Sequence, residues 1–156
     1  MRFEDRVTIV TGGGSGLGRV LAHRFAAEGA AVVVADVAGE RASAVVDEIS
    51  DSGGRSLSQT TDVTDASDVR AMVETAREAF GPVDILVNNA AKATDADFQS
   101  LGEEAWDEDV NITLKGPFLC SQSVLADMVE NGSGVIINIS SVNSRATAWP
   151  RPVYST

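Results

Sequence analysis

A glycine-rich segment near the start of the chain has the residue types and the spacing of a phosphate-binding turn. Thr11-Gly12-Gly13-Gly14-Ser15-Gly16-Leu17-Gly18 lies between an apolar run at 7–10 and a helical pattern at 19–28. Backbone N–H groups at a helix N-terminus point toward a bound anion, and the helix dipole favours negative charge there. Glycine is needed because a Cβ would hold a pyrophosphate away from the backbone. The segment therefore predicts a nucleotide site shaped by Gly12, Gly16 and Gly18.

An acidic residue stands where a dinucleotide site needs one. Asp36 ends the apolar run 31–35 and lies 24 residues after Gly12, close to the offset of about 20 residues at which a carboxylate binds the adenosine ribose. Glycine turns also occur in plain loops, and a solvated strand-end acid is the alternative for Asp36. Because strand, turn, helix, second strand and acid follow in order, we interpret the segment as the start of a domain that binds a nicotinamide dinucleotide.

The elements that must hold these residues alternate along the chain. Runs rich in Val and Ile are typical of strands whose two faces are covered by helices in a parallel sheet. Glycines follow the expected helices, and Asp65 is expected to cap the third helix. Repeated βα units predict a doubly wound α/β parallel sheet of the Rossmann type, with strand order 3-2-1-4-5. The expected strands are 6–10, 31–36, 56–61, 85–88 and 134–139, and the expected helices are 16–28, 39–51, 66–80 and 103–130.

Composition indicates a globular protein and narrows the range of partners. The 156 residues fit one domain, 44% are hydrophobic, and a net charge of −11 argues against nucleic acid and anionic membranes. The single cysteine, Cys120, excludes an internal disulfide, offers no metal cluster and is expected in the core. The acids near the N-terminus disfavour a signal peptide, and no apolar run approaches the roughly 18 residues of a membrane span. We therefore expect a cytoplasmic protein without a metal site.

The chain resembles the N-terminal part of a short-chain dehydrogenase/reductase. Each matching motif is weak alone, whereas their order and spacing together are highly specific. The resemblance implies an oxidoreductase that transfers a hydride between NAD(H) and an alcohol or carbonyl substrate, with a dinucleotide-binding domain over residues 1–156. The motifs are Thr11-Gly12-x-x-x-Gly16-x-Gly18, Asp36, Asp62-Val63, Asn88-Asn89-Ala90, Asn111, Ile139-Ser140-Ser141 and Tyr154.

The resemblance also implies how the cofactor is held. Asp36 would accept hydrogen bonds from both ribose hydroxyls and repel a 2′-phosphate, so NAD is expected rather than NADP. Ser15 and Val37 stand where NADP-using relatives often carry a basic residue. Asp62-Val63 would flank the adenine, with helix capping as the alternative for Asp62. The expected cofactor-binding residues are Gly12, Ser15, Gly16, Leu17, Gly18, Asp36, Val37, Asp62, Val63, Asn89, Ala90, Ala91 and Tyr154.

One position departs from the family pattern at the end of the fourth strand. The family has Asn-Asn-Ala-Gly, whereas this chain has Asn88-Asn89-Ala90-Ala91. Glycine tolerates backbone angles that alanine does not, so the loop that carries the nicotinamide ribose could shift slightly. Two asparagines that merely hold the strand edge are the alternative to a cofactor role.

The resemblance assigns the chemistry to Ser141, Tyr154 and Asn111. Ser141 follows the fifth strand, and Tyr154 comes 13 residues later, which is the family spacing. Tyr154 would act as general acid–base, Ser141 would hold and polarise the substrate oxygen, and Asn111 would hold a water in a proton relay. A helix-interior amide bonded to backbone is the alternative for Asn111. The segment 149–152 is equally compatible with a pocket wall and a plain turn, and His23 is expected to be a packing or surface residue.

The family motif Tyr-x-x-x-Lys is incomplete here, because only Ser155 and Thr156 follow Tyr154. We expect the sequence to be the N-terminal part of a longer enzyme whose domain is incomplete at the C-terminus. A truncated, non-catalytic NAD-binding module is the alternative, and a dehydratase or epimerase of the same family is a third hypothesis. The resemblance further implies a small-molecule alcohol or ketone substrate and a homodimer or homotetramer. The substrate itself is not determined.

Overall fold

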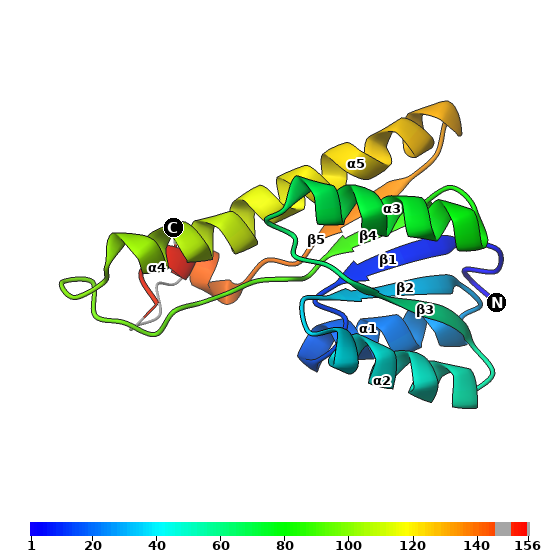
Figure 1. Ribbon diagram of the computed structural model, residues 1–156, viewed down its shortest axis with the longest axis horizontal. Coiled ribbons are helices and arrows are strands. Elements are labelled where there is room, and N and C mark those ends of the chain that lie inside the picture. The colour runs from blue at the N-terminus through cyan, green and yellow to red at the C-terminus, as the bar shows by residue number, and fades with distance from the viewer. Residues whose placement is uncertain (146–150, 156) are drawn as a thin grey trace.

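The structure, a computed structural model, describes residues 1–145 and 151–155. Parallel strands form one sheet in the order β3-β2-β1-β4-β5 (Figure 1), which confirms the predicted order. Each strand boundary lies within one residue of the expected one, and β2 and β4 coincide with the expected ranges. The strands are β1 Val7–Thr11, β2 Ala31–Asp36, β3 Arg55–Thr60, β4 Ile85–Asn88 and β5 Val135–Asn138.

Helices cover both faces of the sheet. Figure 1 shows α1 and α2 on one face and α3 and α5 on the other, as a doubly wound fold requires. Within the described ranges, no helix is both long and apolar enough to cross a membrane. The helices are α1 Gly16–Ala27, α2 Gly39–Asp51, α3 Ala66–Phe80, α4 Glu103–Val110 and α5 Gly116–Glu130, with a π-helical segment η1 Asn111–Lys115 and two 3-10 turns, η2 Val142–Ser144 and η3 Val153–Ser155.

Two apolar clusters pack against opposite faces of the central strands and hold the ends of those strands in place. Successive side chains of a strand point to opposite faces. Ile9 and Val33 therefore join the cluster under α3 and α5, whereas Val10 and Val32 join the cluster under α1 and α2. Strands β1, β2 and β4 are buried along their whole length. The residues at their carboxyl ends are consequently held by a packed core.

The helix expected over 103–130 is wrong as one continuous α-helix. The chain follows a single helical path, but η1 interrupts it between α4 and α5, and the Gly116 N–H donates to the Asn111 carbonyl five residues back. Pro117 explains the change, because proline has no N–H to donate and its ring clashes with the carbonyl four residues earlier. The Gly116-Pro117 pair in the sequence thus indicates that the α-helix is interrupted there.

Strand β5 also differs from the expectation that helices cover both faces. It lies at the sheet edge, and its apolar residues stay accessible: Val135 is 52% exposed and Ile137 is 36% exposed. An apolar run predicts a strand but does not say whether any neighbour covers it. This edge is where Ser141 follows the sheet.

Candidate functional site

Two adjoining cavities lie along the carboxyl edge of the sheet. The first, here called the glycine-turn cavity, has a volume of about 640 Å³ and runs from Gly12 and Asp36 to Lys92. The second, the serine–tyrosine cavity, has a volume of about 490 Å³ and is lined by Ser141 and Tyr154. Ala90 and Ala91 line both cavities, so the two spaces meet at the end of β4. This is the position at which open α/β sheets bind ligands.

The glycine turn has the geometry of a phosphate cradle. Gly12 and Gly16 have φ angles of +62° and +51°, which L-residues with a side chain rarely adopt. A Cβ on Gly18 would collide with the Gly12 carbonyl oxygen, whereas a Cβ on Gly16 would meet nothing within 4 Å. Ser15 precedes α1 without a side-chain capping bond, and the first N–H groups of a helix have no partner inside it. The turn therefore fits a ligand phosphate.

Asp36 is not a solvated strand-end acid, because its exposure is only 5%. Its Oδ2 accepts the Gly14 N–H at 3.0 Å, which ties the acid to the glycine turn. Its Oδ1 accepts the Ala38 N–H at 2.9 Å and an Nη2 hydrogen of Arg41 at 3.2 Å. The carboxylate lines the glycine-turn cavity at the same time. Sequence reasoning singled out Asp36 but missed Arg41, whose only hint was a basic residue one turn into the next helix.

The end of β4 is bonded directly to the glycine turn. The Asn89 side chain donates to the Thr11 carbonyl at 2.9 Å and to the Gly12 carbonyl at 3.2 Å. The Thr11 hydroxyl oxygen accepts the N–H groups of Asn89 at 3.0 Å and Ala90 at 3.1 Å. Asn89 therefore holds the strand edge, which was the alternative to a cofactor role, while it also borders the cavity. Thr11 is the joining residue that sequence reasoning did not assign.

Asp62 lies on the cavity wall and does not cap a helix. Its Oδ1 accepts the N–H of Thr64 at 2.8 Å, while Asp65 accepts the N–H groups of Ser67 and Asp68 at the start of α3. The capping alternative for Asp62 is therefore wrong, and the predicted Asp65 cap is confirmed. Hydrogen bonds from Ser67 hold the pKa of Asp65 below its usual value.

The loop after β4 is clamped onto the long helical path. The Thr113 hydroxyl donates to the Lys92 carbonyl at 3.0 Å and accepts the Lys92 N–H at 3.2 Å. Asp109, only 1% exposed, accepts the N–H of Thr94 at 2.9 Å and its hydroxyl at 2.8 Å. Ala91 does not have a positive φ, so the alanine fits this loop without backbone strain.

Ser141 and Tyr154 share the serine–tyrosine cavity although they come from separate turns. Ser141 precedes η2, and its Oγ accepts the Asn143 N–H at 3.2 Å. Tyr154 lies in η3, which packs near α4 at the far end of the helical path. The fold thus brings together the serine and tyrosine that the sequence analysis paired.

Asn111, the third expected catalytic residue, does not lie in the cavity that Ser141 and Tyr154 share. It begins η1 and lines neither cavity, whereas Ile112 lines the glycine-turn cavity and Thr113 the serine–tyrosine cavity. Its carbonyl is bonded to the Gly116 N–H, which is the π-helical pattern. π-Helical insertions occur frequently at functional sites.

Asn88 belongs to the Asn-Asn-Ala motif but was not among the expected site residues, yet it lines the serine–tyrosine cavity. Its Nδ2 donates to Asn138 Oδ1 at 2.8 Å and to Ser121 Oγ at 3.2 Å. Its Oδ1 is buried and, in the part of the chain that the structure describes, has no hydrogen-bond partner. A buried acceptor without a partner is costly and is normally satisfied by water or a ligand.

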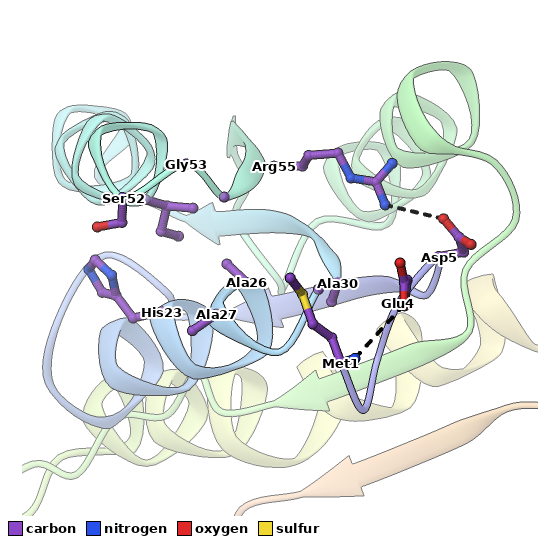
Figure 2. A pocket seen from close by; sticks show the side chains of 13 residues that line it. Met1, Glu4, Asp5, His23, Ala26, Ala27, Ala30, Ser52, Gly53 and Arg55 are labelled. Carbon is purple, nitrogen blue, oxygen red and sulfur yellow. Dashed lines mark ion pairs between the residues drawn. The ribbon is translucent and has the colours of Figure 1, made fainter.

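A third cavity lies at the opposite, amino edge of the sheet and carries no comparable chemistry. Figure 2 shows Met1 beside Ala30, and dashed lines mark the ion pairs of the N-terminus with Glu4 and of Arg55 with Asp5. Both ion pairs are 3.8 Å long. Its volume is about 530 Å³, but neither the glycine turn nor Ser141 borders it. Size alone therefore does not identify the functional site.

Other residues have the structural roles that were expected of them. His23 pairs with Glu48 at 2.8 Å on the surface between α1 and α2. Cys120 is buried, and burial raises the pKa of its thiol to about 12. Trp149 and Pro150 of the segment before Tyr154 lie outside the described residues, whereas Arg151 pairs with Asp95 at 2.6 Å.

Comparison with known proteins assigns a family to this site. The sequence profile of the family described as short chain dehydrogenase matches residues 6–156. The chain is 45% identical over 141 residues to (2S)-[(R)-hydroxy(phenyl)methyl]succinyl-CoA dehydrogenase subunit BbsD of Thauera aromatica, covering 90% of this chain and 57% of that protein. It is 37% identical over 142 residues to 3-oxoacyl-[acyl-carrier-protein] reductase FabG of Thermotoga maritima, covering 91% and 58% respectively.

A solved structure agrees with these sequence matches. A 7 alpha-hydroxysteroid dehydrogenase complexed with NADH and 7-oxo glycochenodeoxycholic acid superposes with a TM-score of 0.94 and 33% identity, over 99% of this chain and 60% of that one. The chain thus spans between 57% and 60% of the length of these three relatives. The profile match, the sheet order and the glycine turn lead to one conclusion: the chain belongs to the short-chain dehydrogenase/reductase family of oxidoreductases.

Proposed function

We propose that this protein binds NAD(H) in the glycine-turn cavity and interconverts an alcohol and a carbonyl compound in the serine–tyrosine cavity. The observation that carries the proposal is the junction of the two cavities at Ala90 and Ala91. A dinucleotide held by the glycine turn would extend its nicotinamide toward Ser141 and Tyr154. When bound, the nicotinamide supplies or accepts the hydride, and the protein provides the remaining chemistry.

The residues around the glycine-turn cavity bind and orient. The N-terminus of α1 offers N–H groups to the pyrophosphate, with Ser15 and Leu17 on the cavity wall. Asp36 accepts hydrogen bonds from the adenosine ribose, and its buried negative charge favours NAD(H) over NADP(H). Asp62 and Val63 border the same space and would flank the adenine.

The residues around the serine–tyrosine cavity would handle the substrate oxygen. Ser141 would donate a hydrogen bond to that oxygen and polarise it. The Tyr154 hydroxyl would give the oxygen a proton on reduction and remove one on oxidation. Asn111 would orient a water that relays this proton. No metal is required for these steps.

The substrate is a small-molecule alcohol or ketone in this proposal, and the protein acts in the cytoplasm as a homodimer or homotetramer. Exposed apolar side chains on the helical path support an oligomer: Leu114, Phe118, Leu125 and Val129 are at least half exposed and recur at helical spacing. Light scattering of the purified protein would measure the oligomeric state directly.

The test of the proposed function compares cofactor binding with turnover in the complete gene product. NADH fluorescence titration measures binding, and absorbance at the nicotinamide band measures turnover with a panel of ketones. We expect Tyr154→Phe to bind NADH normally and to lose turnover by about 10²- to 10⁴-fold. Joint loss of binding and turnover in this variant would contradict the assigned role. Binding without any turnover in the unmodified gene product would support the non-catalytic module instead.

A further inference from the structure

A cation stands beside the acid at the ribose end of the glycine-turn cavity. Arg41 belongs to the first turn of α2 and lines this cavity together with Asp36. The two side chains form an ion pair at 3.2 Å, but the arginine is 55% exposed whereas the aspartate is 5% exposed. The carboxylate is therefore buried in the wall, and the arginine side chain that pairs with it remains accessible to solvent.

Asp36 and Arg41 differ in how many of their hydrogen-bonding groups are already used within the protein. Asp36 already accepts from Gly14, Ala38 and Arg41, so its charge is partly compensated before any ligand binds. The guanidinium of an arginine carries five N–H donors, and within the described ranges the Arg41 side chain makes a single hydrogen bond, the one to Asp36. Most of its donors thus remain for a ligand.

The other charged residues on the cavity wall do not compete with Arg41 for this place. Lys92 and Glu108 form an ion pair with each other, and Asp62 bonds to Thr64. Ser15 and Val37, the neighbouring positions on the glycine turn and after β2, carry no charge. Arg41 is accordingly the cation of the wall that borders Asp36.

From this arrangement we propose that Arg41 is a specificity-determining residue that binds the 2′-phosphate of NADP(H) and narrows the preference for NAD(H) set by Asp36. The inference rests on the proposed function, since it assumes that the cavity binds a nicotinamide dinucleotide. Arginine suits the task because its planar fork donates two parallel bonds to a phosphate. Asp36 repels the 2′-phosphate, and Arg41 offsets part of that repulsion by pairing with the carboxylate and by facing the phosphate.

The experiment measures dissociation constants for NADH and NADPH by fluorescence titration in four proteins: the unmodified protein, Arg41→Met, Asp36→Ser and the double variant. Methionine keeps an unbranched side chain and removes the charge. We expect Arg41→Met to weaken NADPH by about tenfold and NADH by less than about threefold, which is the size of one charge-assisted hydrogen bond. Asp36→Ser is expected to reverse the preference toward NADPH, and the double variant to lose that reversal.

Controls separate a local effect from general charge loss. Arg24→Met removes an arginine that is also more than half exposed but lies in the last turn of α1, away from the glycine turn, where it pairs with Glu28. This variant is expected to leave both constants unchanged. Arg41→Lys is expected to recover part of the NADPH affinity. If Asp36→Ser fails to fold, as circular dichroism would show, Asp36→Asn replaces it because the amide keeps the shape of the carboxylate.

The outcomes distinguish this inference from the proposed function. Two results would overturn the role of Arg41 while NADH binding stands. One is an equal NADPH affinity in Arg41→Met and the unmodified protein; the other is a double variant that prefers NADPH as strongly as Asp36→Ser does. A protein that binds neither NADH nor NADPH would refute the proposed function itself.

Discussion

Two regions of the carboxyl edge of the sheet, the glycine turn and the end of β5, differ in how firmly burial and hydrogen bonds hold their residues in place. At the glycine turn, strands β1 and β2 are buried throughout, and Asp36 and Asn89 are bonded to backbone groups of the turn. At β5, the strand is largely accessible, and within the described ranges the Ser141 hydroxyl accepts one hydrogen bond, from the Asn143 N–H. The glycine-turn end is thus preorganised, whereas the serine–tyrosine end has a sparser framework.

This difference has a physical basis in strand position. A central parallel strand is covered on both faces and paired on both edges, so its carboxyl end cannot move independently. An edge strand is paired on one side only. Binding geometry at the glycine turn is therefore more sensitive to small changes than geometry near β5.

The largest expected effect comes from adding one methyl group at the glycine turn. Gly18→Ala places a Cβ against the Gly12 carbonyl oxygen and within 2.6 Å of Asn89 Nδ2. We expect a loss of about 3 kcal/mol in unfolding free energy by urea titration, together with loss of NADH binding. Gly102→Ala is the control, because a Cβ there meets nothing within 4 Å. Unchanged stability of Gly18→Ala would show that the turn is less rigid than its contacts indicate.

A smaller effect is expected where α5 is anchored to α3 and to the loop before β4. Arg77 binds Asp127 through Nε at 2.9 Å and Nη2 at 2.8 Å, and the Val83 N–H adds a bond at 3.2 Å. These bonds, led by the one from Arg77, hold the pKa of Asp127 below its ordinary value. Asp127→Asn is expected to cost about 2 kcal/mol at neutral pH, because both groups keep some contact with water.

The pH dependence of this variant gives a second check. A carboxyl group whose pKa is lower in the folded state stabilises the protein above its unfolded pKa of about 3.9. That stabilisation is lost as the pH falls through the folded pKa. The advantage of the unmodified protein over Asp127→Asn should thus be constant from pH 7 to about 5 and shrink below about pH 4. Glu74→Gln, a change at the 61% exposed partner of Arg77, should show neither effect.

Matched substitutions in two strands test the comparison most directly. Val33 in β2 is 0% exposed, whereas Val135 in β5 is 52% exposed. Replacing either valine by threonine keeps the shape and exchanges one methyl group for a hydroxyl group, which is costly only where water cannot reach it. Urea titration should show a loss of about 2 kcal/mol for Val33→Thr and less than about 0.5 kcal/mol for Val135→Thr. Equal losses would mean that β5 is covered in solution.

The smallest effect concerns reactivity and leaves stability untouched. Burial raises the pKa of the Cys120 thiol to about 12, so little thiolate exists at neutral pH. The folded protein is expected to resist alkylation by iodoacetamide at pH 8, and the urea-unfolded protein to react fully, as read by mass spectrometry. Stoichiometric labelling of the folded protein would show that α5 opens readily.

Much of the fold was predictable because its signals are local. Apolar runs bounded by glycines located every strand to within one residue, and the βα repeat predicted the sheet order. The N-cap of α3 at Asp65 was also predictable from the sequence. The helix 103–130 was mispredicted because the apolar periodicity outweighed Pro117, whose missing N–H shifts the ladder to the π pattern. The expected dinucleotide-binding domain over 1–156, incomplete at its C-terminus, stays a prediction.

The candidate site was predictable in its residue types and less so in its contacts. The glycine turn, Asp36, Ser141 and Tyr154 all border the two cavities. Asn111 borders neither, and its relay role stays a prediction. Arg41 was missed, and Thr11 and Asn88 were named in motifs without an assigned role, because the importance of all three depends on partners that no spacing rule relates to them.

The sequence by itself determined the family, the order of the strands and the turn that suits a phosphate, since each follows from residue types at short, regular spacings. Only the tertiary structure decided which groups far apart in the sequence meet. Asn89 reaches the Thr11 carbonyl across 78 residues of chain, and Arg77 reaches Asp127 across 50. Such contacts are made by packing the strands and helices together, so their donors and acceptors become identifiable once the fold has set their distances.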